Sequence, residues 1–222
     1  MQQESKTDKS SPLRFGVMCK GMVFQRWQAA ALKELREHGH HLVLLIRDAR
    51  QDPEIPRINR LLKKKRNTIL FTFLENRVLN PDARKGEDLG RELAGITMLN
   101  CKVECNGFSE YFNPADVGEI RNCRLDFILR FGFNIIRGDI LSAARFGVWS
   151  FHHDDETMYR GGPAGFWEIY NGDPVNGAIL QRLTNRLDGG VILRKGYLKT
   201  IMHSYKGNLE QLLSVTSSWP AL

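Results

Sequence analysis

Short, nearly continuous apolar runs alternate with longer amphipathic or polar stretches along this chain. Residues 14–19 form one such run, residues 23–38 carry apolar side chains three and four positions apart, and residues 41–46 form a second run. Continuous apolar runs are typical of strands buried on both faces, and the three- and four-residue spacing is typical of a helix packed on a sheet. The pattern predicts a strand, a helix and a parallel strand in succession.

The same alternation continues through the rest of the chain. We expect further strands at residues 101–105, 125–130, 147–151, 177–183 and 191–198. We expect helical segments, the first of them capped by Asn113, at residues 114–122, 139–145, 164–170 and 208–219. Strands that alternate with helices predict an α/β, Rossmann-like fold, with a mostly parallel central sheet flanked by helices.

The length of 222 residues fits one such domain. We expect the polar residues 1–12 to be a disordered lead-in and residues 13–222 to form a single domain. Residues 52–99 are heavily charged, are broken by prolines and predict a helical insertion. No stretch is apolar enough to cross a membrane and no secretory leader is visible, so the cytoplasm is the expected compartment.

Charge and cysteine content change this picture little. The net charge of +7 favours an anionic partner without identifying one. The basic run at residues 61–66 could contact phosphates, but we favour a solvated helix face because no aromatic side chains are interleaved with it. The four cysteines lack paired spacing, so we expect them to pack as small hydrophobic residues, and we expect no metal.

The strand at residues 147–151 is followed at once by the polar segment HHDDE, at residues 152–156. Ligands of open α/β sheets bind outside the carboxyl ends of the strands, so His152 lies where a site is expected. A histidine there can act as a general acid or base when a carboxylate orients its ring. Asp188 is a candidate for that carboxylate, since Gly189 and Gly190 after it allow a tight turn and close approach of the backbone to a ligand.

Residues 125–193 resemble the catalytic core of the folate-dependent formyltransferase superfamily. That family carries Asn-x-His at a strand end, then Tyr/Phe-Arg-Gly, Trp and Gly, and finally Asp-x-Gly. The positions that match without gaps are Ser150 and His152, Tyr159, Arg160 and Gly161, Trp167, Gly172, Gly177, and Asp188 with Gly189 and Gly190. Agreement at this many spaced positions is more specific than any one of them, and it implies the family's Rossmann-like catalytic domain.

The resemblance also implies a chemistry. In the family, an amine attacks the formyl carbon of formyltetrahydrofolate, and the oxyanion that forms needs hydrogen-bond donors. His152 would donate to the oxyanion or relay the proton, and Asp188 would orient the imidazole. The donor cofactor would bind to Phe133, Asn134, Ile135, Ile136, Arg137 and Gly189. An apolar slot edged by backbone groups suits its flat ring.

Two departures from the family pattern lie next to His152. Ser150 replaces the catalytic asparagine, and a hydroxyl has a shorter reach than an amide. His153 and Asp154 replace a Pro-Ser pair. His153, Asp154 and Asp155 are a candidate polar wall for an amine substrate or a site for a divalent metal, although a solvated loop is the simpler interpretation. Arg160 and Gly161 of the matched motif are the other candidate substrate-binding residues.

Three functions follow. The first is transfer of a formyl group from formyltetrahydrofolate to a primary amine of a small molecule, such as an amino sugar. The second is hydrolysis of the same donor, and the third is binding without catalysis, in which Ser150 marks lost chemistry. We do not expect tRNA as substrate, because the chain ends soon after the catalytic core. We do not expect glycinamide ribonucleotide either, because residues 19–22 lack the phosphate loop of the enzymes that act on it.

Overall fold

The structure, a computed structural model, describes residues 11–50, 79–186 and 189–222. Its strands are β1 (Arg14–Cys19), β2 (Val23–Gln25), β3 (His41–Asp48), β4 (Gly86–Asp88), β5 (Thr97–Cys101), β6 (Val103–Asn106), β7 (Ser109–Phe112), β8 (Phe127–Arg130), β9 (Ile135–Arg137), β10 (Val148–His152), β11 (Val175–Arg182) and β12 (Val191–Lys199). Its helices are α1 (Arg26–Glu37), α4 (Pro114–Asn122), α5 (Trp167–Asn171) and α6 (Tyr205–Thr216), with short 3-10 turns η1 (Asp82–Arg84), η2 (Asp139–Ser142) and η3 (Trp219–Ala221).

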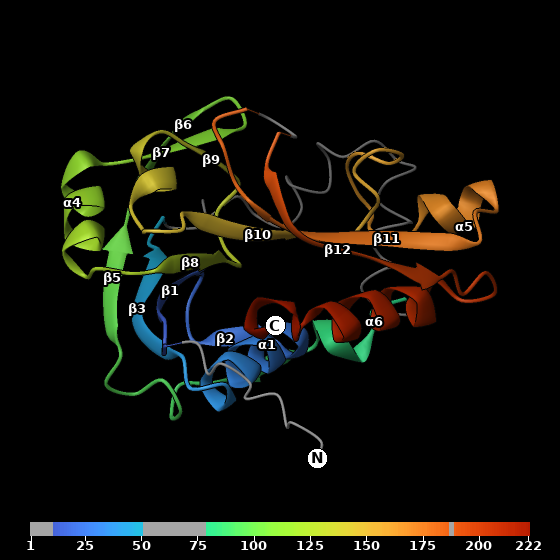
Figure 1. The fold of residues 1–222 in the computed structure, drawn as a ribbon, viewed down its shortest axis with the longest axis horizontal. Coiled ribbons are helices and arrows are strands. Elements are labelled where there is room, and N and C mark those ends of the chain that lie inside the picture. Colours follow the sequence, from blue (N-terminus) through green and yellow to red (C-terminus); the bar gives the residue numbers. More distant parts are fainter. Residues whose placement is uncertain (1–10, 51–78, 187–188) are drawn as a thin grey trace, which may run out of the picture.

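A seven-stranded sheet in the order β12-β11-β10-β8-β1-β3-β5 forms the centre of the molecule (Figure 1). Neighbouring strands from β10 to β5 pair in parallel, whereas β11 pairs antiparallel with both β10 and β12. The expected α/β fold with a mostly parallel sheet is therefore confirmed. The carboxyl ends of β8 and β10 lie next to each other at one edge of this sheet.

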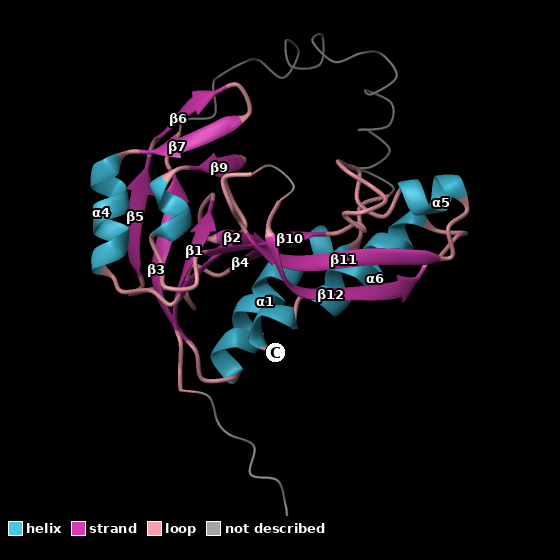
Figure 2. Ribbon diagram, turned by 45° about the horizontal axis from the view of Figure 1, so that its top comes forward, coloured by secondary structure: helices cyan, strands magenta, loops and turns pink. Residues whose placement is uncertain are grey.

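The sheet is covered on both faces, because successive side chains of each strand point to opposite sides. Phe15, Val17 and Phe127 join the core beneath α1, while Met18 and Ile128 join a second core beneath α4. Figure 2 shows α1 and α6 together on one side and α4 beside β5 on the other. Each fully buried side chain of this kind contributes about 1.5–3 kcal/mol.

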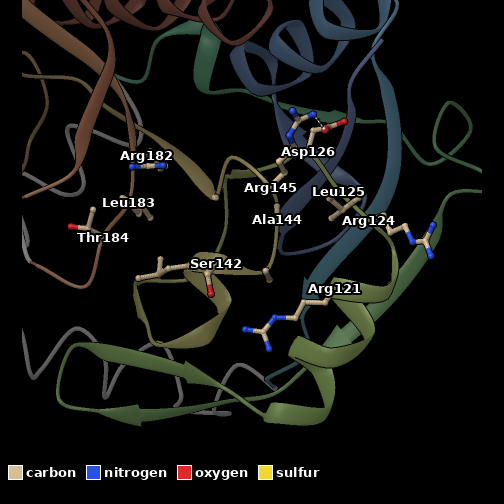
Figure 3. Close-up of a pocket in the computed structure, with 13 residues that line it drawn as sticks. Arg121, Arg124, Leu125, Asp126, Ser142, Ala144, Arg145, Arg182, Leu183 and Thr184 are labelled. Carbon is tan, nitrogen blue, oxygen red and sulfur yellow. Dashed lines mark ion pairs between the residues drawn. The ribbon is translucent and has the colours of Figure 1, made fainter. Parts of the chain in front are cut away.

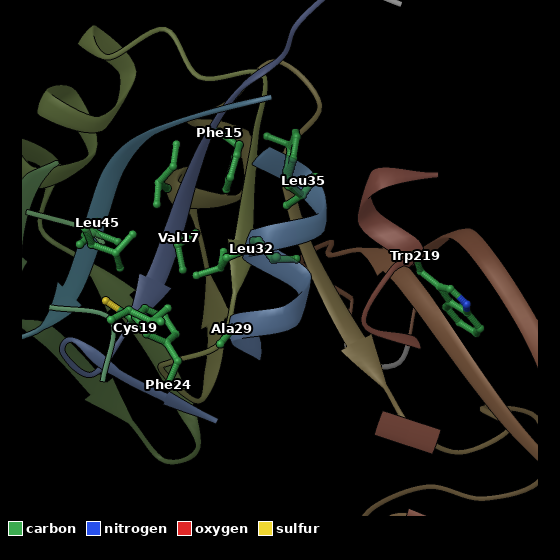
Figure 4. Close-up of a cluster of buried hydrophobic side chains, with 14 of the residues drawn as sticks. Phe15, Val17, Cys19, Phe24, Ala29, Leu32, Leu35, Leu45 and Trp219 are labelled. Carbon is green, nitrogen blue, oxygen red and sulfur yellow. The ribbon is translucent and has the colours of Figure 1, made fainter. Parts of the chain in front are cut away.

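Helix α1 supplies the apolar stripe of the first core. Leu32 and Leu35 of the helix lie beside Phe15 and Val17 of β1 (Figure 4). The helix begins three residues later than its periodicity predicts, because residues 23–25 pair with β4 instead and the Gln28 side chain accepts a hydrogen bond from the backbone N–H of Gln25, the capping residue, at 3.0 Å. The predicted start at residue 23 is therefore wrong, and the cap marks the actual boundary.

The helix at residues 114–122 follows the sequence prediction. The Asn113 side chain accepts a hydrogen bond from the backbone N–H of Ala115 at 2.9 Å, which satisfies one of the unpaired donors at the start of α4. The strand expected at residues 125–130 begins two residues later, at Phe127 of β8. The helical segment expected at residues 139–145 is the short turn η2.

Two features depart from the sequence prediction. A three-stranded sheet in the order β6-β7-β9 was not expected; Figure 1 shows it above α4. Of the expected helical insertion at residues 52–99, residues 79–99 carry η1, β4 and the start of β5, so this part is wrong. The remainder of that insertion, the basic run at residues 61–66 and most of the predicted disordered lead-in lie outside the described residues.

No helix in the described ranges is both long and apolar enough to span a membrane.

Candidate active site

A pocket of about 290 Å³ opens at the carboxyl ends of β8 and β10. Its walls come from these strand ends, from β9 and from the loops that follow β11 and precede β12. The lining residues include His152, Ser150, Arg130, Gln181, Gly161 and Gly190. This is the edge at which α/β sheets bind their ligands, and it brings together segments that lie far apart in the sequence.

A row of three polar side chains crosses the floor of the pocket. β10 pairs with β8 through Val148 and Ile128 and then Trp149 and Leu129, so the next pair along is Ser150 and Arg130. On its other side Ser150 pairs with Gln181 of β11. His152 lies two residues beyond Ser150 and therefore on the same face of the strand. The sequence singled out Ser150 and His152 as site residues but not Arg130.

Ser150 is 2% exposed, and its hydroxyl is bonded in both directions. It accepts hydrogen bonds from Nε and Nη2 of Arg130 at 3.1 and 2.9 Å, and it donates to the carbonyl of Phe151 at 3.3 Å. A hydroxyl has one proton, so in this arrangement it has none left to donate into the pocket.

Four of the six residues expected to hold the donor line the pocket, namely Asn134, Ile135, Ile136 and Arg137, whereas Phe133 and Gly189 do not. The Phe133 ring packs against Phe112 instead, with ring centroids 4.8 Å apart. Phe133 has a φ of 64°, which is unusual for a residue with a side chain. The turn is held by the backbone N–H of Asn134, which donates to Glu110 at 2.7 Å.

The loop after β11 forms the opposite wall. Asn185 ties it to the turn after β9, because its carbonyl accepts from Arg137 and its side chain accepts from the backbone N–H of Gly138 at 2.9 Å. Gly190 lies against Gln181, and an added Cβ would be 2.2 Å from Oε1 of that side chain. The close approach of the Gln181 side chain therefore explains why residue 190 is a glycine. Asp188, the expected partner of His152, lies outside the described residues, and the neighbouring Gly189 is not among the pocket-lining residues.

His153 points away from the pocket, contrary to the polar wall that the sequence predicts. Its ring stacks on Phe151 and meets the edge of Trp27, with centroids 5.7 and 5.2 Å away. Its Nε2 lies 3.0 Å from Oγ1 of Thr216. Burial, followed by the nearby positive charges, lowers the pKa of His153 to about 3, so the ring is neutral. The alternation of a strand sends residues 152 and 153 to opposite faces, which is why only one of them reaches the pocket.

The acids of the HHDDE segment also lie away from the pocket lining. Asp154 is 3% exposed and accepts from the backbone N–H of Gly165, and burial raises its pKa to about 7. Lys195 of β12 lies 3.0 Å from both Asp155 and Glu156. Burial opposes ionisation of Asp155, but hydrogen bonds from Thr157 and Lys195 outweigh it and lower the pKa to about 2. These acids therefore serve packing and charge balance, and Asp154 is not placed to contact a ligand in this pocket.

The remaining predicted substrate-binding residues are divided. Gly161 lines the pocket, whereas Arg160 is exposed and does not. The loop that carries them is fixed by Tyr159, whose hydroxyl donates to Asp173 and accepts from the side chain of Asn171. Among the residues that the structure describes, no group of three or more histidines, cysteines or acids could hold a metal ion.

A second, wider hollow of about 720 Å³ lies at the other end of β8 and β10. Figure 3 shows four arginines around it, Arg121, Arg124, Arg145 and Arg182. Arg145 pairs with Asp126 at 3.7 Å. The sequence did not single out this basic surface, because its arginines come from four separate segments.

The known proteins that are similar to this chain come from the same superfamily that its motifs resemble. No family model matches the chain. The methionyl-tRNA formyltransferase of Agathobacter rectalis is 26% identical over 144 residues, which are 62% of this chain and 45% of that protein. The chain spans about half the length of the curated relatives it matches.

Solved structures resemble the chain over nearly its whole length. Glycinamide ribonucleotide transformylase 1 of Symbiobacterium toebii has a TM-score of 0.60 at 16% identity, and covers 95% of this chain and 84% of its own. A formyltetrahydrofolate deformylase of Pseudomonas syringae has a TM-score of 0.57 at 14% identity, over 95% of this chain and 59% of its own. The chain thus has the formyltransferase fold, and the similarities support its resemblance to the formyltransferase superfamily.

Proposed function

We propose that the chain transfers a formyl group from formyltetrahydrofolate to a primary amine of a small molecule. One observation carries this proposal: a single pocket at the carboxyl edge of the sheet is lined by both His152 and residues 134–137. The first could supply the proton transfer that the reaction needs, and the second a place for the donor.

The donor site is proposed on residues 134–137. Ile135 and Ile136 offer apolar side chains, and the extended backbone of β9 offers amide and carbonyl groups along one edge. Flat rings with polar edges bind in slots of this kind. Bound there, formyltetrahydrofolate would supply the formyl group, and the pocket floor would lie under the reacting carbon.

The proton transfer is assigned to His152. A neutral imidazole takes the proton that the attacking amine loses and returns it to the leaving nitrogen. We propose Asp188 as the carboxylate that orients this ring. Gly161, which lines the pocket, would let the backbone come close to the substrates.

The acceptor is proposed to be a small-molecule amine, and an amino sugar is the class to test first. Because one relative is named as a methionyl-tRNA formyltransferase, methionyl-tRNA has to be tested as a second acceptor. The four cysteines of the chain are all free, which fits a reducing compartment such as the cytoplasm.

The test measures loss of formyltetrahydrofolate and formylation of the acceptor with amino sugars, free amines and charged tRNA. We expect formylation of at least one amine by the wild type and a loss of about 10²–10⁴-fold in His152→Ala. His203→Ala removes an exposed histidine elsewhere and is the matched control, with activity unchanged. Full activity in His152→Ala would refute the assignment.

Hydrolysis of the donor is the alternative that the deformylase similarity keeps in the test. Hydrolysis needs a group near His152 that positions a water molecule, and the acids that follow His152 in the sequence are the candidates. Asp154 is buried away from the pocket, and Asp155 is paired with Lys195, so these two acids give hydrolysis no support. Formate release without acceptor, at the rate seen with the best amine, would favour hydrolysis over transfer.

A further inference from the structure

Arg130 ends a strand that is otherwise fully apolar. Phe127, Ile128 and Leu129 are completely buried, and Arg130 follows them at the carboxyl end of β8 and lines the pocket. A charged side chain at this position has to be held by neighbouring polar groups, because it cannot reach bulk water freely. Its partners therefore indicate what the side chain is for.

Four hydrogen bonds hold the guanidinium. Nε and Nη2 donate to the hydroxyl of Ser150 at 3.1 and 2.9 Å. Nη1 donates to the carbonyls of Phe133 and Asn134 at 3.2 and 2.9 Å. A guanidinium has five N–H groups, so one N–H of Nη2 has no partner among the described residues.

The positive charge of Arg130 is not neutralised by these partners. All of them are uncharged oxygens, and no carboxylate in the described part of the chain forms an ion pair with Arg130. Burial lowers the pKa of Arg130 from its ordinary value, and the more distant Glu110 opposes this only in part. Arg137 and Arg186 also line the pocket. A partly buried cation in such surroundings favours an anion placed beside it.

We infer that Arg130 is a catalytic residue, whose guanidinium binds the oxyanion formed during formyl transfer, and that Ser150 is a positioning residue that holds it. This inference rests on the proposed function. It also accounts for the serine in place of the family's asparagine: the donor comes from the neighbouring strand, while the serine hydroxyl orients it.

The step balances without any further reagent. The acceptor nitrogen forms a bond to the formyl carbon, and the C=O electron pair moves onto oxygen, giving the oxyanion that Arg130 binds. Collapse restores the C=O bond and breaks the bond from the formyl carbon to the donor nitrogen. That nitrogen takes up the proton that the acceptor nitrogen lost through His152.

A purely structural role makes a different prediction. The bonds from Arg130 to Phe133 and Asn134 support the turn that precedes β9, so a structural arginine would act through the donor site. Its removal would then raise KM for the donor. An oxyanion donor acts only in the transition state, and its removal lowers kcat instead.

The test compares Arg130→Ala, Arg130→Lys and Ser150→Ala. We expect Arg130→Ala to lower kcat about 10²–10³-fold, with KM for the donor within about threefold. Free guanidinium should restore part of this kcat, and Arg130→Lys should keep part of it. Ser150→Ala should lower kcat about tenfold or less, because the two carbonyls still hold the arginine. Arg121→Ala removes an exposed arginine outside this pocket and is the matched control.

Each outcome decides the inference. Wild-type kcat in Arg130→Ala, a change confined to KM, or a larger loss in Ser150→Ala than in Arg130→Ala would overturn it while the proposed function stands. A parallel titration with ¹³C-formate, followed by NMR, does not depend on turnover. Binding by the wild type that is lost in Arg130→Ala supports the anion site even if no amine is formylated. No turnover and no formate binding would overturn both.

Discussion

The end of β10 presents two faces with different neighbours. On one face Ser150 and His152 line an open pocket. On the other, Phe151 and His153 stack on each other and pack against Trp27. Two adjacent histidines thus receive opposite environments, one suited to chemistry and one to packing. The two-residue repeat of the strand, rather than the residue type, selects the residue that can act on a ligand.

The largest expected effect on stability lies on the packed face. His153→Ala removes a ring that contacts Trp27 and Phe151 and a hydrogen bond to Thr216. We expect a loss of about 2–4 kcal/mol in the free energy of unfolding. Urea denaturation measures it, and His152→Ala should lose less than about 1 kcal/mol in the same assay. Equal losses in the two variants would remove the distinction between the faces.

A smaller effect is expected on the pocket face. Gly190→Ala would place a Cβ 2.2 Å from Oε1 of Gln181 and 3.0 Å from the carbonyl of Arg182. The Gln181 side chain must move, and we expect kcat/KM for formyl transfer to fall about tenfold. Gly118→Ala is the control, since a Cβ there has open space and lies in α4. Unchanged kinetics in Gly190→Ala would show that this wall does not shape the site.

The smallest expected effect is a change in pH dependence. Burial, with Glu168 nearby, raises the pKa of Asp154 to about 7, so the folded state binds its proton more tightly than the unfolded state. The stability that this protonation supports is present below pH 4 and is lost as the pH rises to about 7. Asp154→Asn stays neutral and keeps an acceptor for Gly165.

This variant should therefore gain stability relative to the wild type between pH 5 and pH 8, by on the order of 1 kcal/mol. Unfolding in urea at the two pH values gives the difference directly. A stability difference that does not change with pH would show that Asp154 does not titrate in this range.

Much of the fold could be predicted from the sequence, because parallel strands buried on both faces have nearly continuous apolar sequences. The runs at β1, β3, β8 and β10 each appeared at about the right place. The strand expected at residues 101–105 overlaps β6, but its partners β7 and β9 were missed because they have only four and three residues and partly apolar faces. Strands this short carry too few positions for alternation to be recognised.

The site was predictable only in part. His152 was found from its place after an apolar run, and the same rule applied to residues 125–130 would have indicated Arg130. The separation of His152 from His153 required knowing that the alternation of side chains reaches His153, one residue beyond the end of β10. The ion pair between Asp155, in the loop after β10, and Lys195 of β12 could not be predicted. The two residues are 40 positions apart, and such a contact leaves no local pattern in the sequence.

The most direct test of the pocket is a crystal structure of the chain with a bound reduced folate. We expect the ring against Ile135 and Ile136, and the nitrogen that carries the formyl group facing His152 and Arg130. His153 should remain between Phe151 and its neighbours in the core. A folate bound instead in the arginine-lined hollow of Figure 3, or bound with no contact to His152, would contradict the assignment of this face as the active site.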